Sequence, residues 1–163
     1  MSVVNREKLL IHKVHGLCEI IDQIEMGGNQ YYKVRVVGED GLTLYCPIDK
    51  KGELYRDLIS KEQAVALFEY MKTIKDVKFD SSKQRRTQFK EMLFSGDPKN
   101  IAYILRVLYI YKRYKDDKNQ TLGLEDKKMF DYAENLMKDE LSVVFNVDKS
   151  DIDQLISANL SDL

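Results

Sequence analysis

The turn Ser95-Gly96-Asp97-Pro98 separates two stretches of helical hydrophobic spacing and fixes where a helix must begin. Asp97 can cap the unpaired backbone N–H groups of a new helix, and Pro98 suits the first helical position, where no donor is needed. We therefore predict a helix that starts at Pro98 and packs one face against a core. The apolar stripe of that face is Ile101, Ile104, Leu105, Leu108 and Tyr111 or Lys112.

The segment before this turn predicts a shorter helix with a basic start. Lys83, Arg85 and Arg86 stand at that start, and no carboxylate follows them before Glu91. We expect this end of the helix to face water or a polyanion. The apolar positions of the same helix are Phe89, Met92 and Leu93.

The formal net charge of −1 hides an uneven distribution of charged residues. Residues 83–128 carry 12 Lys and Arg against 6 Asp and Glu, whereas residues 129–163 carry 2 against 8. This polarity favours one basic face that can meet an anionic partner. The alternative is that the two segments pack together and neutralise each other.

Composition and apolar runs favour a globular, cytoplasmic protein with no membrane contact. The 163 residues are 44% hydrophobic and 33% charged, which is typical of a folded soluble domain. The amino-terminal segment lacks the uninterrupted apolar core of a signal peptide, and the most apolar later run is interrupted by Arg106. Cys18 and Cys46 form no CxxC pair, so we predict buried, reduced thiols.

Residues 9–59 have the composition and spacing of β-strands. Two turn signals separate the first three strands, Gly27-Gly28-Asn29 and Asp40-Gly41. We predict an antiparallel meander of four or five short strands that forms a strongly curved sheet or an SH3-sized barrel. The expected strands are Val14–Ile24, Tyr31–Val37, Leu42–Ile48 and the short stretch Leu54–Leu58.

At Ser60 the spacing of apolar residues changes from the two-residue alternation of strands to the spacing of helices. Ser60 and Gln63 also have the spacing of a helix capping box. The sequence therefore predicts an α+β protein with a β-module at residues 1–58 and an all-helical domain at residues 59–163. Ala64, Leu67, Phe68 and Met71 form the expected stripe of the first helix of that domain.

Four further expectations complete the helical domain. Lys75–Ser82 is predicted to be an ordered loop and Tyr114–Thr121 a charged loop. Leu124–Phe145 is predicted to be the longest helix, and Ser150–Asp153 resembles a capping box for a short helix that ends at Ile156. The buried stripe of the longest helix is expected at Met129, Tyr132, Ala133, Leu136, Met137 and Leu141.

No pattern in the sequence favours catalysis, a metal or a cofactor. GxxxxGK[ST], GxGxxG and GxSxG motifs are absent. His12 and His15 lie three apart at the start of a strand, a spacing that does not bring two imidazoles to one metal ion. The neighbouring carboxylates Asp116-Asp117 and Glu125-Asp126 are expected on exposed segments, without the pocket that general acid catalysis needs. We therefore predict a binding protein and not an enzyme.

Two kinds of binding are consistent with the sequence. A small β-module can accept a partner's strand at its open edge. Arg85, Arg86, Lys127 and Lys128 lie near the starts of two predicted helices, where backbone donors and the helix dipole add to the attraction for phosphate. The alternative is that these cations are only a solvated surface.

A succession of short motifs along nearly the whole chain resembles the CarD family of bacterial transcription regulators. The carboxy-terminal part of the resemblance, in which SGD precedes a long helix and a closing DEL, is its most specific portion. The motifs in chain order are HG at His15-Gly16, YYKV, a Pro that ends the third strand, Arg56-Asp57-Leu58, RR at Arg85-Arg86, SGD, LYIYKR and EDKKMFDYAENLMKDEL.

The resemblance implies an amino-terminal Tudor-like β-domain that pairs with the β subunit of RNA polymerase. It also implies a carboxy-terminal helical domain that contacts promoter DNA near the upstream edge of the melted bubble and stabilises the open complex. We expect DNA contacts at Lys83, Arg85, Arg86, Lys127 and Lys128, of which Arg85, Arg86 and Lys127 match family positions. The candidate polymerase contacts are Arg35, Leu44 and Tyr45.

Three positions depart from the family pattern. The family tryptophan that wedges into the minor groove is replaced by Ser82 or Lys83, and the chain contains no Trp. Tyr45 replaces a family arginine used for the polymerase contact, and His12-Lys13 replaces the usual Tyr-Pro. We therefore expect weak, largely backbone contact with promoter DNA. The alternative function is a protein-interaction adaptor that has lost DNA contact, and the sequence does not indicate the oligomeric state.

Overall fold

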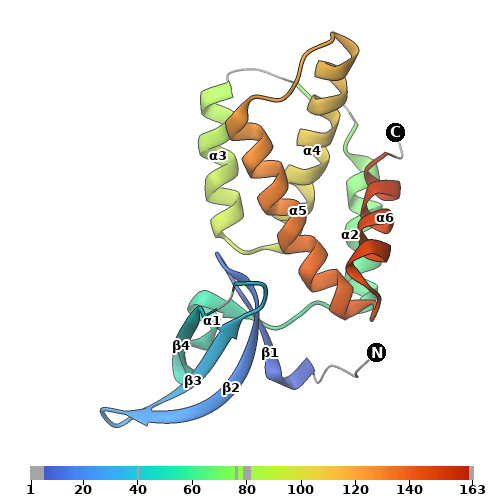
Figure 1. The fold of residues 1–163 in the computed structure, drawn as a ribbon. Helices are drawn as coiled ribbons and strands as arrows, with labels where there is room; N and C mark the ends of the chain where they lie inside the picture. Colours follow the sequence, from blue (N-terminus) through green and yellow to red (C-terminus); the bar gives the residue numbers. More distant parts are fainter. Residues whose placement is uncertain (1–5, 40, 76, 79–81, 162–163) are drawn as a thin grey trace. The chain divides into compact units, whose positions relative to one another are not determined.

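The computed structural model describes residues 6–39, 41–75, 77–78 and 82–161, and the chain divides into two compact units (Figure 1). We call Met1–Ile59 the β-unit and Ser60–Leu163 the helical unit. The β-unit is a curled antiparallel half-barrel of five strands, and helices make up the other unit. The predicted α+β fold class is therefore confirmed.

The five strands of the β-unit are ordered β4-β3-β2-β1-β5, and every pair is antiparallel. The turn predicted at Gly27-Gly28 joins β2 to β3, and both glycines adopt positive φ, 57° and 83°, which residues with a side chain rarely do. Asp40 of the second predicted turn lies outside the described residues. The strands are β1 Leu9–His12, β2 Gly16–Met26, β3 Asn29–Val36, β4 Thr43–Pro47 and β5 Tyr55–Arg56.

The inner face of the half-barrel is a small apolar core. Cys18 and Cys46 are both free thiols in this core, as predicted, and both are completely buried. Burial raises the pKa of Cys18 to about 11 and also raises that of Cys46, so both side chains act as small hydrophobes. The other buried members are Leu10, Val34, Val36 and Tyr55.

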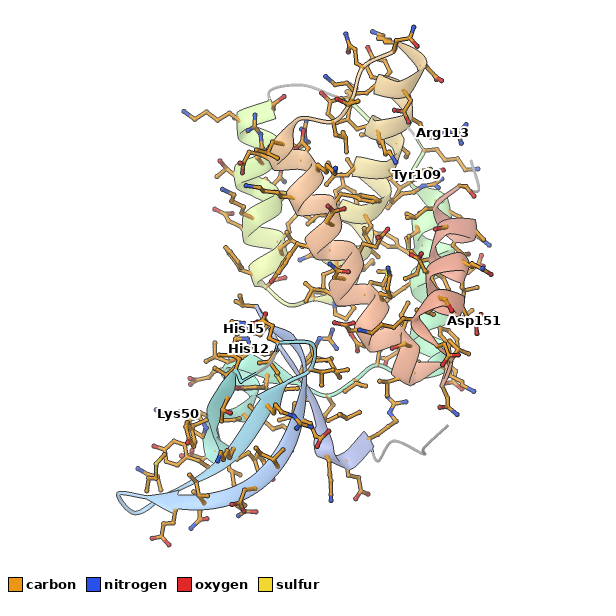
Figure 2. All side chains as sticks on the ribbon, in the orientation of Figure 1. His12, His15, Lys50, Tyr109, Arg113 and Asp151 are labelled. Carbon is orange, nitrogen blue, oxygen red and sulfur yellow. The ribbon has the colours of Figure 1, made fainter. Side chains whose placement is uncertain are left out.

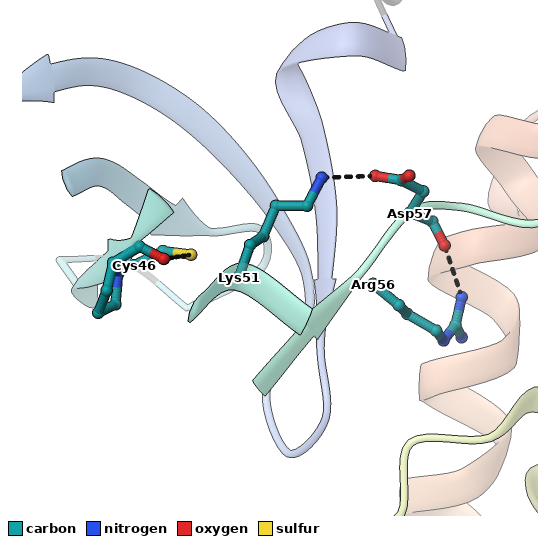
Figure 3. Close-up of polar contacts among 5 residues, drawn as sticks. Cys46, Lys51, Arg56 and Asp57 are labelled. Carbon is teal, nitrogen blue, oxygen red and sulfur yellow. Dashed lines mark hydrogen bonds and ion pairs between the residues drawn. The ribbon is translucent and has the colours of Figure 1, made fainter. Parts of the chain in front are cut away.

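Two features of the β-unit differ from the sequence-based expectation. Leu9–His12 forms a strand of its own, β1, which hydrogen-bonds to both β2 and β5. The segment after β4, where no helix was predicted, forms a 3₁₀ turn at Ile48–Lys50 and the short helix α1 at Lys51–Leu54, so Leu54 of the expected stretch Leu54–Leu58 is helical. Lys51 Nζ lies 3.1 Å from Asp57 Oδ1, which ties α1 to the segment after β5 (Figure 3).

The helical unit begins at the predicted capping box. Ser60 Oγ accepts a hydrogen bond from the backbone N–H of Gln63 at 3.1 Å, and Gln63 Oε1 accepts one from the N–H of Ser60 at 2.8 Å. The cap predicted at Asp97 is also present, since its carboxylate accepts from the N–H of Lys99 at 2.9 Å. The helices are α2 Lys61–Thr73, α3 Ser82–Phe94, α4 Pro98–Asp117, α5 Leu124–Val144 and α6 Lys149–Leu160.

Helix α4 is the centre of the helical unit and packs against α2, α3, α5 and α6. Its predicted stripe is buried at Ile101, Ile104, Leu105 and Leu108, but Tyr111 is only half-buried and Lys112 is exposed. Buried residues of the neighbouring helices include Phe89 and Leu93 of α3 and Met129 and Met137 of α5. Across the described residues, no helix is both long and apolar enough to span a bilayer.

Three predicted segments of the helical unit need correction. The charged loop expected from Tyr114 is wrong at its start, because α4 continues to Asp117 and ends where Asn119 adopts a φ of 56°. Helix α6 starts at Lys149 after Asp148 and runs to Leu160, so Ser150 lies inside it. The loop expected at Lys75–Ser82 falls partly outside the described residues, and Ser82 already belongs to α3.

Arg106 lies in the middle of α4 and is completely buried. Its Nε donates to the carbonyl oxygen of Ile74, just past the end of α2, at 3.0 Å, and its Nη1 donates to that of Leu160 at the end of α6. Carbonyl groups at helix ends lack intrahelical partners and carry partial negative charge, so a guanidinium satisfies them well. One side chain thus joins the carboxy-terminal ends of two helices to α4.

We expect Arg106→Met to destabilise the helical unit by about 3 kcal/mol, because the carbonyls of Ile74 and Leu160 lose donors that an apolar side chain cannot replace. Urea unfolding followed by helical circular dichroism measures the loss. Arg113→Met, at an exposed arginine of the same helix, is the matched control and should change stability little. Equal stability of the two variants would contradict this role for Arg106.

Candidate functional site

The amino-terminal ends of α3 and α5 lie side by side and form what we call the basic end: Lys83, Arg85, Arg86, Lys127 and Lys128 (Figure 1). Arg85 Nη2 of α3 lies 2.6 Å from Asp126 Oδ2 of α5, although the two residues are 41 positions apart. This ion pair joins the starts of the two helices. All five cations predicted to contact DNA therefore belong to one end of the helical unit.

Because of this ion pair, the Arg85 side chain does not face solvent as the other cations of the basic end do. The side chains of Arg85 and Asp126 are only 11% and 8% exposed, and the Arg85 guanidinium lies 4.7 Å from the ring centroid of Tyr111. The expectation that this helix start faces water or a polyanion is therefore wrong for Arg85, and the expectation that Asp126 lies on an exposed segment is wrong as well. Sequence spacing missed the pair because its members come from different helices.

Part of this buried ion pair lacks hydrogen-bond partners. In the described structure, Nε and Nη1 of Arg85 and Oδ1 of Asp126 are buried without a partner. Removing both charged groups from water costs free energy, and the attraction between them offsets this cost only when the ion pair has good geometry. Removal of one partner therefore leaves a buried and uncompensated charge.

The other four cations are more accessible. Lys83, Lys127 and Lys128 are exposed, and Arg86 is half-buried with its Nε donating to the carbonyl of Ser82 at 3.1 Å. The first turn of α3 holds no acidic residue, which leaves its positive dipole end uncompensated by carboxylates. In contrast, Glu125 and Asp126 occupy the first turn of α5, so the predicted contribution of the helix dipole to anion binding is stronger at α3.

An aromatic and cationic cluster on α4 was missed at the sequence level. The rings of Tyr111 and Tyr114 stack 6.4 Å apart, Lys115 Nζ lies 5.3 Å from the Tyr111 centroid and Lys118 Nζ lies 4.2 Å from that of Tyr114. These are helical i, i+3 and i, i+4 spacings, but the segment was predicted to be a loop. The cluster extends the basic end, because Arg85 packs on the same Tyr111 ring.

The acidic segment at the carboxy terminus pairs partly within itself. Lys138 Nζ lies 3.1 Å from Asp153 Oδ1 and 3.9 Å from Glu134 Oε1, and Lys149 Nζ lies 2.9 Å from Asp139 Oδ1. Burial raises the pKa of Glu134. Lysines within the segment therefore neutralise part of the negative charge of residues 129–163.

The three candidate polymerase contacts do not share one face of the sheet. Tyr45 is 48% exposed, and Arg35 pairs with Glu19 at 3.4 Å with its own side chain 55% exposed. Tyr45 lies opposite Lys33, so Tyr45 and Arg35 both point to the outer face. Leu44 alternates to the inner face and packs against the apolar core. β4 is an edge strand, which leaves main-chain groups open for pairing.

The two histidines lie together at the turn between β1 and β2 (Figure 2). Their ring centroids are 4.9 Å apart, and His12 Nδ1 accepts hydrogen bonds from the N–H groups of Val14 and His15 at 3.0 and 3.1 Å. Burial, with a smaller effect of His15, lowers the pKa of His12, which fits this acceptor role. Within the described residues, no three His, Cys, Asp or Glu side chains are grouped to hold a metal ion.

Comparison with known proteins gives one family. The family model described as CarD, C-terminal domain, matches residues 66–157 of this chain. That range includes the whole basic end and the Arg85–Asp126 pair. No curated protein matches the chain significantly.

We expect Asp126→Ala to destabilise the helical unit by about 3 to 5 kcal/mol, because Arg85 then remains buried without a counter-charge. The double variant Arg85→Met, Asp126→Ala should lose less than the sum of the two single variants, since it leaves no buried charge. Urea unfolding of the four proteins measures this coupling. Glu125→Ala, at the exposed neighbouring carboxylate, is the control, and strictly additive losses would contradict a coupled buried pair.

Proposed function

Because the chain belongs to the CarD family, we propose that it is a transcription regulator that binds both RNA polymerase and promoter DNA and catalyses no reaction. In this proposal the β-unit binds the polymerase β subunit, and the basic end of the helical unit binds DNA upstream of the melted region. Simultaneous binding stabilises the open complex. Such a regulator acts in the bacterial cytoplasm, where its two partners are found.

The observation that carries the DNA-binding part is the meeting of two basic helix starts. Lys83 and Arg86 come from α3 and Lys127 and Lys128 from α5, and the Arg85–Asp126 pair holds the helices together. Cations at adjacent helix starts suit phosphate groups, which position a protein on the duplex but carry little sequence information. We therefore assign Arg85 to positioning and the other four cations to phosphate binding.

The missing tryptophan determines the expected strength of DNA binding. An apolar wedge unstacks bases at a cost of a few kcal/mol and holds DNA bent or open. At the corresponding place this chain has Ser82 or the exposed Lys83, neither of which can serve as an apolar wedge. DNA binding should therefore be weak, nonspecific and sensitive to salt.

The polymerase-binding part rests on the open edge of β4. Main-chain pairing at an edge strand tolerates side-chain changes better than a specific ion pair does. Tyr45 replaces the family arginine and offers apolar contact beside Arg35 on the outer face. Leu44 supports the strand from its inner face.

The second candidate function is a protein-interaction adaptor that retains polymerase binding and has lost DNA contact. The absence of any Trp in the chain favours it, because the family wedge is then missing altogether. DNA binding by the full chain distinguishes the two functions.

We expect the full chain to bind duplex DNA with an affinity that falls as salt rises. Replacing Arg86, Lys127 and Lys128 by Ala should flatten the slope of log affinity against log salt by roughly two to three, at about 0.9 per lost phosphate contact. Lys61→Ala removes an exposed cation at the start of α2 and should change the slope little. A slope of zero in the unaltered protein would leave only the adaptor function.

We also expect Tyr45→Glu and Arg35→Glu to weaken capture of the polymerase β subunit, because each places a carboxylate on the proposed contact face. A loss of about tenfold in affinity corresponds to about 1.4 kcal/mol. Leu54→Glu, at an apolar residue of α1 that is 51% exposed, is the matched control. Unchanged capture by both outer-face variants would point to another surface or another partner.

A further inference from the structure

The last turns of helix α4 and its cap residue Lys118 present one face that is both aromatic and cationic. Positions 111, 114, 115 and 118 follow the i, i+3, i+4, i+7 spacing of a single helical face. Asp116 and Asp117 lie on the other side of the helix, because successive residues are turned by about 100° around the axis. This face therefore carries two rings and two ammonium groups without a carboxylate. We call it the tyrosine face: Tyr111, Tyr114, Lys115 and Lys118.

The two rings of the tyrosine face differ in exposure. Tyr111 is half-buried, with the Arg85 guanidinium 4.7 Å and Lys115 Nζ 5.3 Å from its ring centroid. Tyr114 is 43% exposed, and its ring plane is within 18° of that of Tyr111. Lys118 Nζ lies 4.2 Å from the Tyr114 centroid and donates to the Tyr114 hydroxyl. Tyr114 is therefore an accessible ring whose position is set by Tyr111 and Lys118.

The tyrosine face adjoins the basic end. Helix α4 continues beyond the level at which α3 and α5 begin (Figure 1). Arg85 connects the two surfaces, because its guanidinium contacts the Tyr111 ring and is paired with Asp126 at the start of α5. A nucleic acid that lies on the basic end therefore has the tyrosine face beside it.

Rings and cations on one face favour one ligand chemistry. A bare anion would use only the lysines, and a duplex hides the faces of its bases inside its own stack. A single strand offers both parts, since its bases stack on aromatic side chains and its phosphates bind Lys. Lysines near a helix end also stabilise its terminal carbonyl groups, but that role does not require an exposed ring.

The lysine that contacts the Tyr114 ring does not prevent stacking. A cation–π contact at an exposed site is weaker than the stacking of a base on the same ring. A base can therefore displace Lys118 from the ring, and the displaced ammonium group is then close to the phosphates of the same strand.

We propose that the tyrosine face binds single-stranded DNA, with one unpaired base stacked on Tyr114 and the neighbouring phosphates held by Lys115 and Lys118. The source of the strand rests on the proposed function, because a melted promoter supplies unpaired bases next to a duplex. The protein then holds a base that has already left the duplex, which is a different contact from a wedge inserted between paired bases.

Binding of labelled oligonucleotides to the full chain, followed by fluorescence anisotropy, tests the need for a base. The probes are a short oligothymidylate and an abasic strand of the same length and charge. We expect oligothymidylate to bind about tenfold more tightly, because only it can stack on Tyr114. Equal affinity for the two strands overturns the proposal and leaves an attraction of general charge.

Three variants separate the Tyr114 ring from other exposed aromatic surface. Tyr114→Ala should weaken oligothymidylate binding by about tenfold, whereas Tyr114→Phe keeps the ring and should retain most of the affinity. Phe94→Ala is the matched control, since it removes a 55% exposed ring at the opposite end of α3 from the basic end. Equal losses in Tyr114→Ala and Phe94→Ala, or in Tyr114→Ala and Tyr114→Phe, overturn the proposal.

A tryptophan introduced at the same position reports stacking directly. The chain contains no Trp, so Tyr114→Trp introduces a single indole whose emission is quenched when a base stacks on it. We expect quenching by oligothymidylate and little by the abasic strand, and neither strand should quench the control Phe94→Trp. Unchanged emission of Tyr114→Trp with saturating oligothymidylate overturns the proposal.

Duplex binding by Tyr114→Ala keeps this inference distinct from the proposed function. Tyr114 carries no charge and is not among the proposed duplex contacts, so this variant should retain the salt slope measured with duplex DNA. If single strands bind without regard to Tyr114 while the duplex slope is intact, only the tyrosine face is excluded. If Tyr114-dependent binding of single strands is found and the duplex slope is zero, the tyrosine face is supported and only duplex binding by the basic end is excluded.

Discussion

The buried guanidinium of Arg106 is the interaction on which the helical unit depends. A charged group at 0% exposure is tolerated only where its donors are satisfied, and here carbonyl groups at the ends of α2 and α6 accept from it. Its neighbours on α4, Leu105 and Val107, are buried as well. Arg106 therefore anchors the ends of α2 and α6 to α4, the same helix against which α3 and α5 also pack.

A second arginine, Arg85, performs the corresponding task where α3 and α5 begin. It bonds to a carboxylate and packs on Tyr111, so it joins three helices through one ion pair and one ring contact. The consequence is a division of roles among neighbouring cations. Arg85 joins the starts of α3 and α5, which places Lys83 and Arg86 at the same end of the unit as Lys127.

Local signals in the sequence predicted most of the fold. The caps at Ser60 and Asp97 were identified correctly because their partners lie within three residues. The Arg85–Asp126 pair and the burial of Arg106 could not be predicted, since their partners are distant in sequence. The end of α4 was missed because its charges resemble a loop, although Tyr114 and Lys118 stabilise it at i, i+4 spacing.

In the proposed function, weak DNA contact is compatible with a clear effect on transcription. A chain already bound to polymerase presents its basic end at a local concentration far above its free concentration, so the second contact is effectively intramolecular. Phosphate contacts from Lys83, Arg86, Lys127 and Lys128 then need little intrinsic affinity. Sequence selectivity comes from the promoter at which polymerase stands. A wedge is therefore not required for recruitment to DNA, and its loss should weaken mainly the ability to hold melted DNA open.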